Sequence, residues 1–155
     1  MRKWISVLLT CALAAGIALG AAAADTAGHL VVSDVSLSTT GLPTQPYADD
    51  GVYMVPLRLI AEQLGYTVAW DSVTGAITVD DDYIQKAVLY GGSTAVSFEG
   101  HLQVINMSRD VEMERAAVIL DGVTYVPLSF FTEFFNDTAV DGNTIVVAPS
   151  MAELQ

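Results

Sequence analysis

The residues most able to do chemistry in this sequence are carboxylates, and three of them are consecutive: Asp80, Asp81 and Asp82. Carboxylate oxygens are hard ligands of the kind that Ca²⁺ prefers. However, consecutive side chains of a strand point to opposite faces, and the sequence has no Asp-x-Asp-x-Asp-Gly loop with a distal Glu. We therefore interpret the run as a solvated turn that discourages edge-to-edge strand pairing, with a weak calcium site as the alternative.

Catalytic motifs are missing from the sequence. A hydrolase needs a nucleophile beside a base, or two carboxylates whose environments separate their pKa values. The chain has no Gly-x-Ser-x-Gly, no His-Glu-x-x-His and no Gly-rich phosphate loop. We expect no enzyme activity, no catalytic residue and no cofactor. The alternative is a small exported hydrolase whose carboxylates meet only in the folded chain.

Aromatic side chains could stack on sugars or on a partner protein. Trp70 shares a strand face with Val68 by the period of two, which places Trp70 in the core. Phe130 and Phe134 lie beside the apolar stripe of a predicted helix that begins near Leu128. They either widen the core or form an exposed strip for a partner or a second copy of the chain.

Arg58 stands near the start of the other predicted helix. A guanidinium group interacts unfavourably with the positive end of the helix dipole, so Arg58 should have a carboxylate partner. A structural ion pair and a contact to a ligand both fit this position. Arg58 therefore joins Phe130 and Phe134 as a candidate for a partner surface.

The elements that position these residues are predicted from a sequence pattern that occurs twice. Residues 50–57 and 121–128 are identical at six of eight positions, and they align without a gap. Apolar residues then recur with helical spacing, at Leu57, Ile60, Ala61 and Leu64 and at Leu128, Phe131 and Phe135.

Each predicted helix has a Pro at its start, and Gly65 and Asn136 occupy the two stop positions. Two extended segments separated by a turn follow each stop. This predicts a duplicated hairpin, helix and hairpin unit, over about residues 47–80 and 117–148.

The remaining segments predict strands. They alternate or are rich in β-branched residues, and Gly-containing turns separate them: 30–38, 84–90, 95–98 and 102–106. The Asp-Gly pair before each copy, Asp50-Gly51 and Asp121-Gly122, predicts a two-residue hairpin loop. We expect an α+β domain with antiparallel strands and two short amphipathic helices packed on the sheet.

The repeated pattern resembles the copper amine oxidase N-terminal-like domain. The matching residues are Val55-Pro-Leu-Arg58, the helix that ends in Leu64-Gly65, Thr67-Val-Ala-Trp70-Asp71, Ala76-Ile-Thr-Val79 and the second Tyr125-Val-Pro-Leu128. The likeness spans about residues 30–148 and implies a non-catalytic, stalk-type module of exported bacterial proteins. The chemistry of such oxidases needs three histidine ligands, whereas the chain has only His29 and His101. The family usually repeats the arginine as well, but Ser129 stands where the second would be.

Residues 1–24 differ from the rest of the chain in composition. Arg2 and Lys3 precede an apolar segment that ends in small residues, which predicts a signal peptide cleaved after Ala24. An uncleaved anchor is the alternative. We expect residues 25–155 to form one exported domain that leaves the membrane after cleavage and lacks the chain's single cysteine, Cys11.

Charge narrows the choice of partner. The formal charge is −12, and loss of Arg2 and Lys3 leaves four basic against 18 acidic residues, or −14 for the stretch 25–155. Such a chain is repelled by polyanions, which excludes nucleic acid and disfavours anionic wall polymers. We expect a secreted or surface module that binds cell-wall glycan or another exported protein. A self-associating spacer is a further alternative.

Overall fold

The computed structural model describes residues 28–102 and 107–150. Half of these residues lie in strands and 13% in helices, so the fold is mostly β and the predicted α+β class is wrong. The two helices are short, and one of them is a 3₁₀ helix. The predicted signal peptide and the Cys11 position lie outside the described residues.

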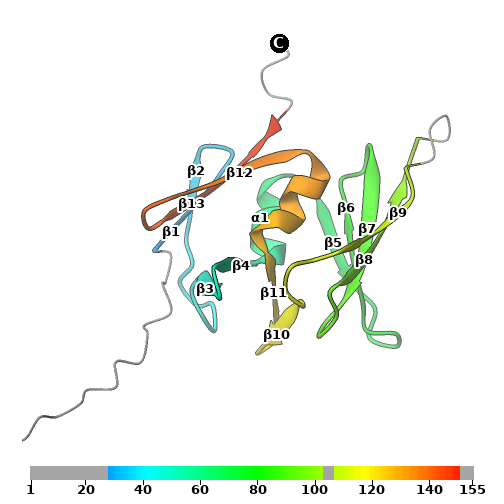
Figure 1. The fold of residues 1–155 in the computed structure, drawn as a ribbon, viewed down its shortest axis with the longest axis horizontal. Helices are drawn as coiled ribbons and strands as arrows, with labels where there is room; N and C mark the ends of the chain where they lie inside the picture. The colour runs from blue at the N-terminus through cyan, green and yellow to red at the C-terminus, as the bar shows by residue number, and fades with distance from the viewer. Residues whose placement is uncertain (1–27, 103–106, 151–155) are drawn as a thin grey trace, which may run out of the picture.

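A five-stranded antiparallel sheet forms one side of the domain (Figure 1). Its strands follow each other in chain order: β5 (Thr67–Trp70), β6 (Ala76–Asp80), β7 (Gln85–Tyr90), β8 (Ala95–Gly100) and β9 (Arg109–Glu112). The last strand was predicted at residues 102–106, four of which the structure does not describe. The sheet is a meander, since each strand pairs with the one before it.

The two segments that share the Val-Pro-Leu pattern meet in a second antiparallel sheet. It has the order β10 (Val118–Leu120), β11 (Val123–Pro127), β4 (Val52–Pro56) and β3 (Tyr47–Asp49). Val55 lies opposite Val126, so the two patterned strands run side by side in the middle of the sheet. Both side chains are fully buried.

The Asp-Gly pairs form the predicted hairpin loops. Asp50 and Gly51 have φ values of 48° and 81°, and Asp121 and Gly122 have 46° and 79°. Positive φ at both central residues is the geometry of a type I′ turn, whose twist matches that of the flanking strands. The prediction for these two turns is confirmed.

A third sheet contains the only parallel strand pair of the described chain. Its order is β12 (Asn136–Asp141), β13 (Thr144–Pro149), β1 (His29–Val32) and β2 (Val35–Leu37), with β1 parallel to β13. The predicted single strand over residues 30–38 is a hairpin instead. Its turn lies at Ser33 and Asp34, which both have positive φ.

The two helices lie between the five-stranded sheet and the sheet that contains β12, β13, β1 and β2 (Figure 1). α1 (Leu57–Gln63) and the 3₁₀ helix η1 (Leu128–Phe134) each begin directly after a Pro, which takes the N-cap position. Gly65 ends α1 in the left-handed conformation, as predicted, with φ of 86°.

The end of η1 differs from the prediction. Phe135, and not Asn136, takes the left-handed conformation with φ of 57°, and its side chain is 43% exposed. Asn136 caps the helix with its side chain instead. Its Nδ2 donates to the backbone oxygens of Phe131 at 3.0 Å and Phe134 at 3.3 Å, and to Tyr66 Oη at 3.0 Å. A buried amide thus hydrogen-bonds to carbonyl groups in the last turn of the helix.

One hydrophobic core joins all three sheets and both helices. The order hairpin, helix, hairpin occurs in β3 to β6 and again in β10 to β13. However, β5 and β6 join the five-stranded sheet, whereas β12 and β13 pair with β1. The structure therefore does not establish the predicted internal duplication.

Candidate binding groove

A groove of about 300 Å³ opens between the five-stranded sheet and the β10–β11 hairpin. One wall is the cross-strand pair of Trp70 and Ile77, and the other includes the pair of Ile119 and Thr124. Partners in register project from the same face of a sheet, so each pair presents its side chains together. Arg58, at the start of α1, lines the groove as well.

Trp70 is 61% exposed, which corrects its predicted place in the core. Trp70 does lie on the predicted face of its strand. Its cross-strand partner is Ile77, which pairs with Leu89, which in turn pairs with Val96, so these four side chains project from the same face of the sheet. The side chains of Ile77, Leu89 and Val96 are 3%, 0% and 1% exposed. Trp70 differs because it lies on the edge strand β5, where no further strand pairs with it.

The opposite wall is held in place by backbone hydrogen bonds. The N–H of Gly92, in the β7–β8 turn, donates to the carbonyl of Ala117 at 2.7 Å, and Ala117 N–H donates to Ser93 O at 3.1 Å. The Gly91 backbone also packs closely on Ile119, since a Cβ on Gly91 would lie 2.6 Å from Ile119 Cδ1. The groove is therefore a preformed feature of the fold.

Arg58 has the carboxylate partner that its position requires. Its Nη1 lies 3.3 Å from Oε1 of Glu62, one helical turn away. The side chains are 57% and 56% exposed, and such a surface pair stabilises a fold by only about 0–1 kcal/mol. Arg58 therefore keeps donor groups accessible at the groove while its charge is balanced.

Sequence reasoning missed Ile119 and Thr124 as groove residues. Ile119 is 47% exposed and its neighbour Leu120 is 37% exposed. Residues 116–120 are all apolar, so both faces of this edge strand are apolar. An edge strand normally carries polar or charged residues on one face. The lack of a polar face in this short edge strand was the available signal that both of its faces pack against other groups.

Of the two interpretations of Phe130 and Phe134, the wider core is confirmed, and the alternative of an exposed partner surface is wrong for the folded domain. Their side chains are 2% and 3% exposed. Both pack on Phe98 of β8, with ring centroids 6.4 Å and 5.5 Å apart, because η1 lies against the inner face of the five-stranded sheet. Phe134 also contacts Tyr66 at 5.3 Å. These phenylalanines belong to the wider core.

The acidic run forms a turn that its own carboxylates stabilise. Asp81 is 6% exposed, and its Oδ1 accepts hydrogen bonds from the backbone N–H groups of Tyr83, Ile84 and Gln85 at 2.7–3.0 Å. The N–H of Asp82 donates to Asp80 Oδ1 at 2.8 Å. Asp82 itself is exposed and has a φ of 63°.

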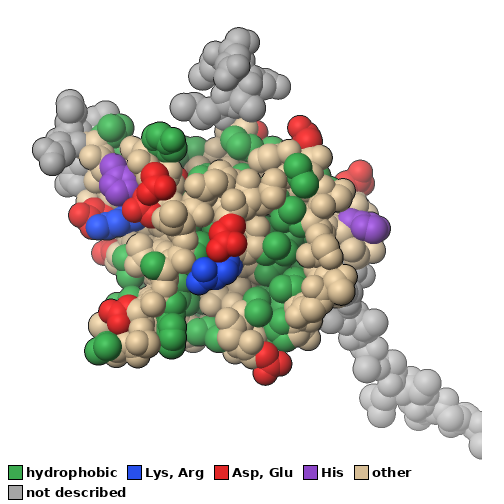
Figure 2. All heavy atoms as spheres, turned by 180° about the vertical axis from the view of Figure 1, so that it is seen from behind, with side chains coloured by type: hydrophobic (Ala, Val, Ile, Leu, Met, Phe, Trp, Pro, Cys, Tyr) green, Lys and Arg blue, Asp and Glu red, His purple; other side chains and the backbone are tan. Residues whose placement is uncertain are grey.

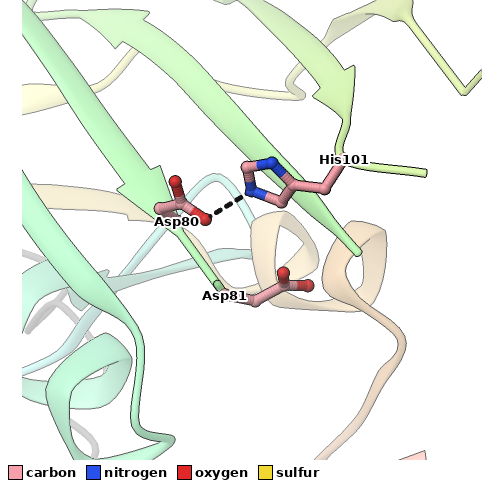
Figure 3. A group of neighbouring side chains, drawn as sticks. All are labelled: Asp80, Asp81 and His101. Carbon is pink, nitrogen blue, oxygen red and sulfur yellow. Dashed lines mark hydrogen bonds and ion pairs between the residues drawn. The ribbon is translucent and has the colours of Figure 1, made fainter. Parts of the chain in front are cut away.

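His101 joins two of the three aspartates. Ligand atoms of Asp80, Asp81 and His101 lie within 4.8 Å of one another (Figure 3). Asp80 Oδ1 and His101 Nε2 point toward each other and are 2.7 Å apart, whereas no hydrogen bond joins Asp81 to either residue (Figure 3). Asp80 Oδ1 and His101 Nε2 are thus paired with each other, and Asp81 Oδ1 accepts the hydrogen bonds of the turn. Asp82, the third predicted calcium ligand, is outside the cluster.

The pKa of Asp80 reflects these contacts. Partial burial raises this pKa, but the hydrogen bonds from His101 and from the Asp82 backbone N–H, with the charges of His101 and Lys86, lower it. The result is a pKa below the ordinary value of 3.8. Asp80 is therefore stabilised as a carboxylate.

Three glutamates, Glu112, Glu114 and Glu133, line a second cavity of about 130 Å³ beside η1. A carboxylate-based hydrolase would place its paired acids in such a cavity. Here Glu133 Oε2 accepts a hydrogen bond from Arg109 at 2.9 Å, and Glu112 accepts one from Thr94. Two of the three carboxylates therefore have structural partners.

Each basic side chain in the described residues has an acidic partner. The pairs are Arg58 with Glu62, Lys86 with Glu99, Arg109 with Glu133, and Arg115 with Asp49 and Asp50. On the face shown in Figure 2, each blue basic group lies against red acidic groups, and green hydrophobic side chains reach the surface between them.

The family model of the copper amine oxidase N-terminal domain matches residues 35–148. The chain belongs to this family. Searches of the curated proteins and of the solved structures found no match. The resemblance that rests on the Val-Pro-Leu segments is thereby confirmed, and β1 lies before the matched range.

Copper amine oxidase N-terminal domains are non-catalytic accessory domains. The residues of this domain do not fit a copper site built from several histidines. The chain has two histidines, and Figure 2 shows their side chains at opposite ends of one face. The only cluster that His101 enters, among the described residues, is completed by carboxylates.

Proposed function

We propose that this protein is an exported, non-catalytic binding module that contacts cell-wall glycan or another exported protein through the Trp70 groove. The observation that carries the proposal is the exposed indole of Trp70 beside a preformed groove of about 300 Å³. Small-ligand sites are concave, largely apolar and contain a few polar groups that fix orientation. This groove has that composition.

Family membership supports the non-catalytic part of the proposal. The matched domain is an accessory domain, and it covers most of the chain. The carboxylates nearest to an active-site arrangement, Glu112 and Glu133, are engaged with Thr94 and Arg109. A turnover assay on a glycan panel should therefore give no product.

Export is supported by the N-terminal sequence alone. Arg2 and Lys3 followed by an apolar segment are typical of a signal peptide. Within residues 28–102 and 107–150, neither helix has the length and apolar character needed to cross a bilayer. N-terminal sequencing of the exported protein tests the predicted cleavage after Ala24.

The charge distribution supports a neutral partner. Because every basic side chain in the described segments has an acidic partner, the protein offers no unbalanced cationic patch to a polyanion. We propose that neither nucleic acid nor an anionic wall polymer is the partner. The many remaining carboxylates would repel both.

The test compares the wild-type protein with Trp70→Ala. Purified protein is co-sedimented with cell-wall preparations and passed over columns that carry purified exported proteins. Binding that Trp70→Ala loses and Tyr83→Ala keeps is the expected result; Tyr83 is a matched control because it is an aromatic residue 82% exposed on another turn.

Two results would overturn the proposal. One is the absence of binding to any wall preparation or exported protein. The other is a mass in light scattering that increases with protein concentration and is unchanged by Trp70→Ala, because this would indicate the self-associating spacer instead.

A further inference from the structure

We propose that the Trp70 groove takes one neutral sugar ring of a glycan chain, with the apolar face of the ring on the indole of Trp70 and its hydroxyl groups toward Arg58 and Thr124. This inference rests on the proposed function, since it names the ligand class of the same groove. Three features support it: the mixture of groups that line the groove, their charge and the rigidity of the walls.

The walls supply both kinds of contact that a sugar ring needs. A pyranose has one face of C–H groups and an edge of hydroxyl groups. The exposed indole of Trp70 and the side chain of Ile119, which is 47% exposed, offer apolar area to the face. Arg58 offers guanidinium donors, and Thr124 offers a hydroxyl that donates and accepts.

An apolar side chain of a partner protein fits this mixture less well. It would cover Trp70 and Ile119 but would leave the polar groups of Arg58 and Thr124 facing hydrocarbon. A polar group that loses water without gaining a hydrogen-bond partner costs about 1–3 kcal/mol. A ligand that is apolar on one face and hydroxylated on its edge avoids that cost.

The charge of the groove favours a neutral ligand. No acidic residue lines it, and its one cation, Arg58, is balanced by Glu62 at 3.3 Å. Because the rest of the chain carries a large excess of carboxylates, an anionic sugar would meet repulsion from the whole surface. An uncharged sugar avoids this repulsion and still uses the guanidinium as a hydrogen-bond donor.

The size and rigidity of the groove favour a small ring. A volume of about 300 Å³ is at the low end for small-ligand sites, which span about 300–1,000 Å³. Trp70 lies on the edge strand of the five-stranded sheet, and its cross-strand neighbours on the same face are in the core. Backbone hydrogen bonds of Ala117 to Gly92 and Ser93 hold the β10–β11 hairpin in place. Binding to preformed walls has a low ordering cost.

The experiment uses intrinsic fluorescence, because Trp4 and Trp70 are the only tryptophans of the chain. In a Trp4→Phe background, the full-length protein is titrated with neutral oligosaccharides: the trimers of N-acetylglucosamine, glucose and mannose. The expected result is a saturable change in Trp70 emission with at least one trimer. Calorimetry with the same trimer then gives affinities for the variants.

Trp70→Ala should weaken binding about tenfold or more, which corresponds to ~1.4 kcal/mol or more. Thr124→Val, which keeps the shape and removes the hydroxyl, should weaken it less. Tyr83→Ala should bind like the wild type, and all variants should keep the wild-type far-ultraviolet circular dichroism.

The outcomes distinguish an error in the ligand class from an error in the location of the binding site. If no neutral trimer binds but an exported protein is bound and lost in Trp70→Ala, the sugar inference is overturned and the proposed function stands. If a trimer binds equally well to wild type and Trp70→Ala, the groove is the wrong site and both proposals are overturned.

Discussion

Arg109 is the least exposed of the basic side chains in the described segments, at 34%. Its Nη1 donates to Gln85 Oε1 at 2.9 Å, and its Nη2 donates to the backbone oxygen and the carboxylate of Glu133 at 3.1 Å and 2.9 Å. The guanidinium also lies 4.4 Å from the centroid of the Phe98 ring. Arg109 thereby ties the strands β7, β8 and β9 to η1.

Replacement of Arg109 by Met should lower the free energy of unfolding by about 1–3 kcal/mol, because it leaves the fully buried Gln85 Oε1 without a donor. Urea unfolding measures this. Arg58→Met is the control, since the exposed pair with Glu62 contributes only about 0–1 kcal/mol. Equal losses in the two variants would contradict the role given to Arg109.

Asp81→Ala should destabilise the domain by about 1–3 kcal/mol, because three backbone N–H groups of the turn lose their acceptor. Asp82→Asn should change stability by less than about 0.5 kcal/mol, since Asn tolerates the positive φ at this position. Thermal unfolding measures both. A melting temperature that rises with Ca²⁺ in the wild type and not in Asp81→Ala would favour the calcium interpretation instead.

The pH dependence of stability should include a contribution from Asp80. Its pKa is lower in the folded state than its ordinary value of 3.8, so the folded state binds this proton less readily than the unfolded chain. The stabilisation is complete above the ordinary pKa and is lost as the pH falls through the folded pKa. In Asp80→Asn, the free energy of unfolding should therefore decrease less than in the wild type as the pH falls below about 5. Urea unfolding at a series of pH values measures this. An equal decrease in the two proteins would contradict this.

Single residues show how far the sequence could predict the site. The strand face of Trp70 and the carboxylate partner of Arg58 follow from local periodicity and helix electrostatics. The exposure of Trp70 does not, because it depends on where the sheet ends and on which element covers its inner face. For the same reason the burial of Phe130 and Phe134 depends on Phe98, which belongs to a different sheet strand and is distant in the sequence.

At the level of elements, local signals predict structure more reliably than they predict distant pairing. The type I′ turns at Asp50 and Asp121 and the stop at Gly65 are encoded by adjacent residues. The parallel pair of β1 and β13 joins residues 29–32 to residues 144–147, and no local pattern encodes such a contact. The 3₁₀ form of η1 was not predicted either, since its apolar spacing also fits an α-helix.

β1 should be essential for stability although it precedes the family-matched residues 35–148. Leu30 is 1% exposed and packs in the core between β2 and β13. Leu30→Ala should cost about 2–5 kcal/mol, as for other buried leucines. Val35→Ala, at a side chain 46% exposed, should cost much less. Similar denaturant midpoints for the two variants would show that β1 is dispensable.

At the scale of the whole molecule, this is an acidic β-rich domain whose few basic residues, within the described segments, are each engaged in ion pairs. Composition alone predicts the repulsion of polyanions, and a motif search predicts a non-catalytic chain. Neither could locate the groove, because the groove forms where the β10–β11 hairpin meets the inner face of a sheet from an earlier part of the chain. The groove is thus a product of tertiary arrangement.

We infer that the groove at Trp70 is the binding surface of this module. The most direct measurement is a nitrogen–proton correlation spectrum of the labelled protein during titration with neutral oligosaccharides and solubilised wall fragments. The indole N–H of Trp70 and the amides of Ile119 and Thr124 should shift together, while those of Ser97 and Asp110, on the far strands β8 and β9, should not. Shifts confined to residues outside the groove, such as Asp80 and His101, would contradict the claim.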